Sequence, residues 1–257
     1  AGFRQRVRTN RFRPSVDVEI ELDIDAMPEG DPWSNYFASR FAFSDSTAAI
    51  TRSVLGAAQP AGEGRFESPH FVEIADESTR VTINGEGLPF YRTTGMRMID
   101  SLLVSEGEVA RRFTYRISMD QPFPMQDALD LLSPPLICGE NNGPPRSGPS
   151  GWFFQLDTRS VQILRILDLV NEPSYEDDEW AEYDQPTSSE GFGFAVRLQE
   201  TEGRQRSTSL RCWRTPTSAR QRDLQGRTLA DLPLDGDAIR IDLTAYEIAD
   251  IELRFEE

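Results

Sequence analysis

The sequence predicts an all-β fold: a large antiparallel β-sandwich with long irregular loops. First, residues 16–24 alternate strictly between apolar and acidic or polar side chains, a period of two that one face of a helix cannot produce. Second, about fourteen short runs of strand-forming residues follow one another with turn signals between them, which is typical of antiparallel sandwiches. Third, these runs do not alternate with helical segments, which disfavours a parallel α/β fold.

The predicted elements follow in order along the chain. Strands are expected at residues 16–24, 37–43, 48–55, 71–74, 80–83, 89–92, 98–104, 110–119, 152–156, 161–170, 192–199, 207–213, 238–243 and 248–255. Asn84-Gly85 favours a hairpin turn, and residues 126–132 form the one helical candidate. Residues 133–151 are rich in proline and glycine, so we expect a long loop there, and residues 171–189 form a second irregular stretch.

The chain length allows one large β domain or two smaller ones, because 257 residues are enough to bury a substantial core either way. We expect residues 1–15 to be an arginine-rich lead-in or interdomain segment, and residues 16–257 to form one sandwich domain. A smaller C-terminal sheet from about residue 190 to 257 is an alternative that the sequence leaves open.

The charge and hydropathy of the chain exclude several classes of partner. A formal net charge of −16 repels phosphate backbones, which disfavours nucleic-acid binding. No apolar run approaches the roughly 18 residues of a membrane span, and no apolar stretch follows the first residues as in a secretory signal. We therefore expect a soluble protein without membrane partners, whose compartment the sequence does not indicate. The arginines of residues 4–13 are expected to pair with the acidic body or with a preceding domain.

The metal-binding and thiol chemistry of the sequence is sparse. With one histidine and two distant cysteines, Cys138 and Cys212, the chain lacks the ligand set of a zinc site. We expect no metal, and two free thiols packed in or near the core. The acidic run Glu176 to Glu179 lacks the spacing of a calcium loop, so a solvated loop is the favoured interpretation.

His70 is the residue around which any histidine-based catalytic device would have to form. It stands at the entry of a predicted strand, where a structural, hydrogen-bonded histidine is the simpler interpretation and a sugar-contacting or interdomain histidine the alternative. Carboxylate pairs cleave glycosides, but 43 acidic residues offer too many candidate pairs to single one out. We therefore predict no catalytic residue.

Clusters of aromatic residues near turns suggest carbohydrate binding, because flat rings stack on the apolar faces of sugars while polar neighbours bind the hydroxyls. Ordinary core packing or loop anchoring remains the alternative for each cluster. The predicted carbohydrate-binding residues are Trp33, Tyr36, His70, Tyr91, Arg92, Glu140, Asn141 and Trp152.

The end of the chain resembles the C-terminus of family 38 glycoside hydrolases, the α-mannosidases. Residues 226–253 carry this resemblance, including the segment Thr244-Ala245-Tyr246-Glu247-Ile248 between two strands. The paired runs 192–199 and 207–213 resemble the strands just upstream in that family. Residues 33–43, 68–71 and 100–108 also resemble bacterial mannosidase-like sequences, so the resemblance covers most of the chain.

The resemblance implies a β-supersandwich, similar to galactose mutarotase, packed against a catalytic α/β barrel in the same polypeptide. In that family the nucleophilic aspartate and the zinc ligands lie in the barrel, and no segment here resembles those motifs. The chain alone is therefore expected to be no enzyme and to hold no cofactor, zinc belonging to the catalytic domain. Two alternatives remain: an autonomous carbohydrate-binding module, and a mutarotase-type enzyme with His70 as its acid.

Overall fold

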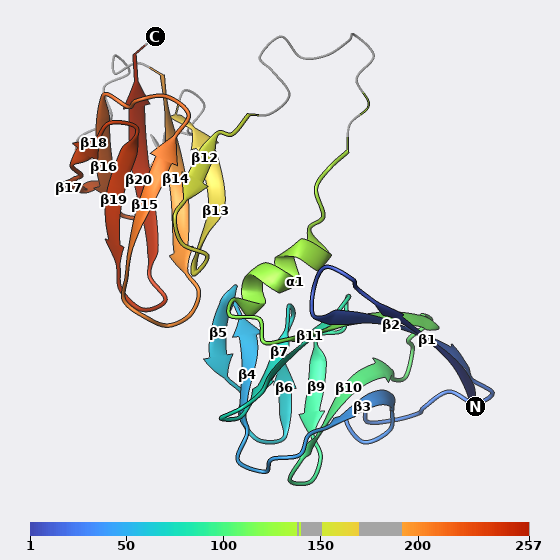
Figure 1. Ribbon diagram of the computed structural model, residues 1–257. Coiled ribbons are helices and arrows are strands. Elements are labelled where there is room, and N and C mark those ends of the chain that lie inside the picture. The colour runs from blue at the N-terminus through green and yellow to red at the C-terminus, as the bar shows by residue number, and fades with distance from the viewer. Residues whose placement is uncertain (138, 140–150, 170–191, 257) are drawn as a thin grey trace, which may run out of the picture. The chain divides into compact units, whose positions relative to one another are not determined.

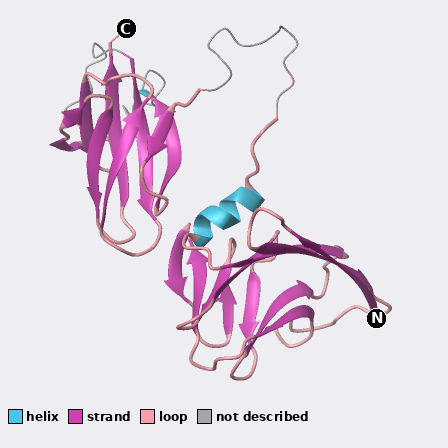
Figure 2. Cartoon of the chain, viewed as in Figure 1, coloured by secondary structure: helices cyan, strands magenta, loops and turns pink. Residues whose placement is uncertain are grey.

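The computed structural model describes residues 1–137, 139, 151–169 and 192–256. The chain divides into two compact units, Ala1–Leu136 and Ile137–Glu257 (Figure 1). Both units are built from antiparallel sheets, and the helix α1 (Pro124–Leu132) belongs to the first (Figure 2). The predicted all-β sandwich class is confirmed.

The domain bounds expected from the sequence, 1–15 and 16–257, do not coincide with these two units. Residues of the expected lead-in form the strand β1 (Gly2–Thr9), which pairs along its whole length with β2 (Ser15–Asp23). The proline-rich stretch 133–151, expected to be a long loop or a crossing between sheets of one domain, includes the boundary between the units. Alternation indicates which residues of a strand face a core, but it does not indicate which core they share.

Unit 1 contains a seven-stranded sheet and a four-stranded sheet, here called the large and the small sheet. The large sheet runs in the order β1, β2, β11 (Arg112–Met119), β8 (Arg80–Gly85), β7 (Val72–Ala75), β4 (Ala49–Val54) and β5 (Ala57–Pro60). The small sheet runs in the order β3 (Phe37–Ala42), β10 (Met98–Val104), β9 (Phe90–Thr93) and β6 (Arg65–Glu67).

The core of unit 1 is formed by the apolar residues of both sheets. It includes the fully buried Ile99 and Tyr91 of the small sheet and Ile83 and Tyr115 of the large sheet. The Tyr115 hydroxyl donates a hydrogen bond of 2.9 Å to Ser101, so this buried polar group is satisfied.

A second, smaller cluster packs α1 against unit 1 through Met125 and Ala128, which contact Ala58 and Phe71. The predicted helix is confirmed. It begins two residues before the expected start, with Pro124 in the first turn, where the missing proline N–H costs no helical hydrogen bond.

Unit 2 also contains two sheets. One runs in the order β12 (Phe154–Leu156), β15 (Arg206–Cys212), β19 (Ala238–Leu243) and β18 (Leu234–Asp235), and the other in the order β13 (Val161–Asp168), β14 (Phe192–Glu200), β20 (Ile248–Phe255), β16 (Ser218–Arg222) and β17 (Thr228–Asp231). Leu198, Leu210, Ile239 and Ile251 are fully buried at its centre. Each unit therefore has its own hydrophobic core, as an independent sandwich requires.

Candidate functional site

A row of charged residues crosses the outer face of the small sheet. Arg40 on β3 pairs with Asp100 on β10, which pairs with Arg92 on β9, which pairs with Arg65 on β6. Directly opposed residues of neighbouring strands point to the same face of a sheet, so these four side chains form one row. We call it the charged row. Their chain neighbours, such as Ile99, are buried in the core, which places the charged row on the opposite face.

Asp100 is the buried centre of this row. Its side chain is 0% exposed, and its two oxygens accept hydrogen bonds from Arg40 Nε at 2.6 Å and Arg40 Nη2 at 2.8 Å. The Tyr36 hydroxyl at 3.0 Å and the Thr94 hydroxyl at 3.2 Å donate to the same carboxylate. The hydrogen bonds from Arg40 hold the pKa of Asp100 below its ordinary value. Asp100 therefore stays ionised and orients its neighbours.

Trp33 lies against the other end of the charged row. Its backbone carbonyl accepts a hydrogen bond of 2.7 Å from Arg92 Nη1, and the Arg65 guanidinium carbon lies 5.5 Å from the centroid of its ring. Phe90 meets the same ring edge-on, with centroids 5.9 Å apart. These contacts fix the half-buried indole in one place, as a stacking platform requires.

The turn that carries Trp33 is closed by Asp31. One carboxylate oxygen of Asp31 accepts the backbone N–H of Trp33 at 3.2 Å, and the other accepts the Ser34 hydroxyl at 2.6 Å. The hydrogen bond from Ser34 is the main reason that the pKa of Asp31 is lowered. Arg65 also lies 3.6 Å from this carboxylate. Arg65 of the charged row therefore contacts the turn in two ways, through an ion pair with Asp31 and through the indole of Trp33.

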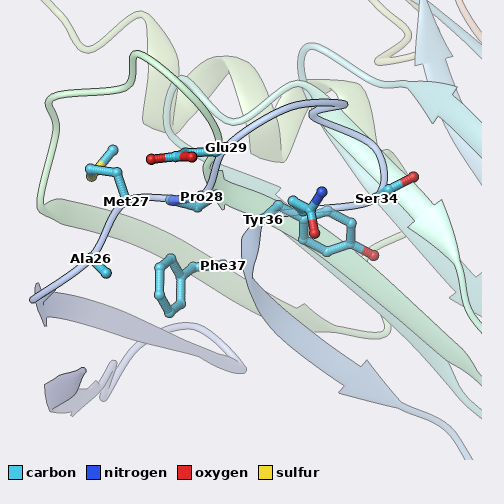
Figure 3. Close-up of a pocket in the computed structure, with 8 residues that line it drawn as sticks. Ala26, Met27, Pro28, Glu29, Ser34, Tyr36 and Phe37 are labelled. Carbon is cyan, nitrogen blue, oxygen red and sulfur yellow. The ribbon is translucent and has the colours of Figure 1, made fainter.

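A cavity of about 400 Å³ lies beside this cluster (Figure 3). The lining residues all come from the connection between β2 and β3 and from the first residue of β3: Ala26, Met27, Pro28, Glu29, Ser34, Asn35, Tyr36 and Phe37. The backbone N–H of Gly30 donates to Glu106 at 2.8 Å, which anchors this connection to the turn between β10 and β11. Two aromatic rings beside an amide and a carboxylate are suited to a small hydroxylated ring.

The structure thus brings together three of the residues predicted from the sequence, Trp33, Tyr36 and Arg92. Tyr91 is not part of this site. It is 1% exposed and stacks on Phe66 in the core, with ring centroids 5.6 Å apart. The physical reason is the alternation of side chains along β9, which sends Tyr91 inward because Arg92 points outward.

His70 lies elsewhere, in the crossing from β6 to β7. Its backbone N–H donates to the Ser53 hydroxyl at 2.8 Å, and its Nδ1 atom is buried without a hydrogen-bond partner among the described residues. Burial lowers the pKa of His70. It is not among the residues that line the cavity described above.

Trp152 belongs to unit 2, where it is 48% exposed. The next residue, Phe153, stacks on Trp213 with ring centroids 4.3 Å apart, as part of an aromatic cluster at one end of that sandwich. Glu140 and Asn141, also predicted to bind carbohydrate, lie outside the described residues, as do Cys138 and the acidic run 176–179.

Three important members of the cluster, Arg40, Arg65 and Asp100, were not predicted as site residues. One signal could have found them: Asp100 is a charged residue in the middle of the apolar run Met98–Val104. A carboxylate in such a place must be paired when it is buried, which directs attention to the arginines of neighbouring strands.

Within the described ranges, no group of three or more histidine, cysteine, aspartate or glutamate side chains could hold a metal ion. Cys212 is a free, buried thiol, and burial raises its pKa to about 12, with a further contribution from the nearby Asp237. No helix in the part of the chain that the structure describes is long and apolar enough to cross a membrane.

Comparison with known proteins relates this fold to two solved structures. No family model and no curated protein matches the chain in sequence. A protein in the glycosyl hydrolase family 38 from Enterococcus faecalis matches 99% of this chain with a TM-score of 0.69 and 14% identity. An alpha-mannosidase from Enterococcus faecalis V583 matches 99% of it with a TM-score of 0.68 and 14% identity.

This chain spans only 30% and 29% of the length of those two proteins. At 14% identity, the likeness shows a shared fold, and the resemblance inferred from the sequence is confirmed at that level. The matched part is less than a third of each neighbour.

Proposed function

We propose that this chain is a non-catalytic β-sandwich portion of an α-mannosidase-like glycoside hydrolase, acting as support for a catalytic domain that lies elsewhere in a longer polypeptide. The observation that carries the proposal is the coverage: nearly all of this chain matches less than a third of two proteins described as a family 38 glycosyl hydrolase and an alpha-mannosidase.

The chemistry of the candidate site also supports a role without bond cleavage. Asp100 is held by three side chains and kept ionised, so it is poorly placed to donate or accept a proton. The described residues offer no ligand group that fits zinc. A zinc ion of the longer polypeptide would then be bound by its catalytic domain.

The first test is the size of the native protein. The chain has a mass of 29.0 kDa, and a 30% share of a longer polypeptide corresponds to about 97 kDa. Antibodies raised against the purified chain should detect a species near that size in the source cells. A native species of the chain's own mass would overturn the proposal.

A second test concerns catalysis. The purified chain, supplied with zinc and an α-mannoside that releases a chromophore on hydrolysis, should show no turnover above the uncatalysed rate. The longer native protein should hydrolyse the same substrate. Turnover by the chain alone would show that it carries catalytic residues and would refute the non-catalytic assignment.

Carbohydrate binding is the second candidate function, favoured by Tyr36, which lines the cavity, and by the half-buried Trp33, whose backbone carbonyl accepts a hydrogen bond from Arg92. Calorimetric titration with mannose and α-mannosides should then show saturable binding at millimolar concentration. Trp33→Ala should abolish it, whereas Trp152→Ala, in the other unit, should retain it. Absence of binding to any glycan would refute an autonomous carbohydrate-binding module and leave the support role standing. No observation favours a mutarotase-type reaction at His70.

A further inference from the structure

β1 is an edge strand that is exposed along its whole length. It pairs with β2 from Gly2 opposite Asp23 to Thr9 opposite Val16, and it forms one edge of the large sheet (Figure 1). Exposed edge strands present unpaired backbone groups, and proteins generally shorten, bend or cover them. β1 has eight residues without proline, so it has none of the usual local protections except its charges.

One face of β1 continues the apolar face of β2 beyond the core. Phe3 stands opposite Leu22, and Val7 stands opposite Val18. The side chains of Leu22 and Val18, both on β2, belong to the core cluster of unit 1. Yet Phe3 is 74% exposed and Val7 is 55% exposed. The small sheet has four strands against seven in the large sheet, so the core ends near β2 and leaves this face uncovered. We call the exposed Phe3 and Val7, together with the half-buried Ile20 and Leu22 beside them on β2, the β1 strip.

The opposite face of β1 carries Arg4, Arg6 and Arg8, each directly opposite an acidic residue of β2. Arg4 lies 3.2 Å from Glu21, and Arg6 lies 3.1 Å from Glu19. Because these charges already have partners within the sheet, a surface that covers the β1 strip need not supply charges of its own. The strand is therefore suited to burial against an apolar surface.

We propose that the β1 strip is the surface through which unit 1 packs against the catalytic domain of the longer enzyme. This inference rests on the proposed function. The two solved structures compared above have about 70% of their length outside the matched part, so a longer polypeptide of that kind contains further chain that can cover the β1 strip. The occupant is thus an apolar surface of the same polypeptide.

A second copy of this chain is a poorer occupant. When two β1 strands pair antiparallel over most of their length with Phe3 and Val7 on one continuous face, arginines face arginines on the other. Like charges directly opposite each other destabilise a strand pair. The arginines on the other face of β1 therefore disfavour the pairing of two copies of the chain through this edge strand.

Hydrogen exchange tests the proposal directly. Amide exchange of residues 2–9 is measured by mass spectrometry in the purified chain and in the longer native protein. We expect exchange to be at least tenfold slower in the longer protein, because β1 is then covered. The turn between β9 and β10, which holds the exposed Met96, serves as the reference and should exchange equally in both.

Variants then separate docking from folding. Phe3→Asp combined with Val7→Asp should lower the melting temperature of the longer protein by several degrees, while Met96→Asp, at a residue that is 83% exposed, should not. In the chain alone the double variant should melt within about 2 °C of the wild type, because the replaced side chains are exposed within unit 1.

The outcomes distinguish the two proposals. Equal exchange of β1 in both proteins, or an unchanged melting temperature of the longer double variant, overturns the docking inference and leaves the proposed function intact. A native species of the chain's own mass overturns the proposed function and this inference with it. Protection of β1 that grows with the concentration of the chain alone would identify a second copy as the occupant and refute our assignment.

Discussion

Replacing Asp100 by asparagine should lower the free energy of unfolding more than any other single change on the outer face of the small sheet. The variant keeps the size of the side chain but removes its charge and turns an N–H group toward the guanidinium of Arg40. Removing one partner of a buried ion pair costs roughly 3–5 kcal/mol. Arg40 is 52% exposed and can regain water, so we expect the lower value of about 2–3 kcal/mol.

Hydrogen exchange measures this loss unit by unit, which a single melting curve of a two-unit chain does not. A loss of about 2 kcal/mol corresponds to a roughly 30-fold acceleration of amide exchange in β3 and β10. Peptides of unit 2 provide the internal reference. Asp25→Asn is the matched control, since that carboxylate is 86% exposed and pairs only with the N-terminal amine among the contacts described here.

The pH dependence gives a further check on Asp100. Because its pKa is lowered on folding, its ionised form stabilises the fold above its ordinary value near 4, and this stabilisation is lost as the pH falls through the lower folded value. Wild type and Asp100→Asn should therefore differ at pH 7 and converge in acid. Exchange within threefold of wild type at pH 7, or equal acceleration in unit 2, would refute the network described here.

Three further predictions test other parts of the structure. The single histidine, His70, should titrate by NMR with a midpoint below about 6.5, because burial lowers its pKa; a midpoint above that value would place it in water or beside an acid. Cys212 should resist alkylation at pH 8 until unit 2 unfolds, because a pKa of about 12 leaves little thiolate; labelling of the native protein within minutes would contradict its burial. Gly193→Ala should destabilise unit 2 by roughly 2 kcal/mol or more and leave unit 1 unaffected, because the added Cβ would lie 2.6 Å from the Leu253 carbonyl oxygen on the paired strand. Peptide-resolved hydrogen exchange measures both effects. The control Gly62→Ala should be neutral, because its added Cβ meets no atom within 4 Å.

Most strands could be predicted from runs of strand-forming residues between turn signals, and in β2 and β20 apolar and charged side chains also alternate along the sequence. β1 was missed because all of its residues are exposed and its arginines resemble a flexible arm. β5, β6, β16, β17 and β18 were also missed, because they have two to five residues, too few to show a clear period. Strand prediction thus failed for short strands and for β1, which has no buried face.

The residues of the candidate site also divide into those that the sequence predicted and those that it did not. Trp33 and Tyr36 could be predicted because they stand three residues apart in one short aromatic segment, Asp31 to Phe37. The grouping of Arg40, Arg65 and Asp100 could not be predicted, because three strands far apart in sequence bring these residues together. Tyr91 was wrongly predicted for a related reason. The sequence does not show whether Tyr91 or its neighbour Arg92 faces the core, and only the pairing of β9 decides this.

The sequence by itself therefore determined the all-β class, most strand positions and the resemblance to family 38 glycoside hydrolases, because these depend on local period and on short segments. Only the tertiary structure decided that there are two cores, that Asp100 joins Arg40 to Tyr36, and that the apolar face of β1 has no cover within unit 1. The physical reason is that strand register and sheet order are set by contacts between distant segments, where a shift of one residue exchanges the buried and exposed faces of a strand.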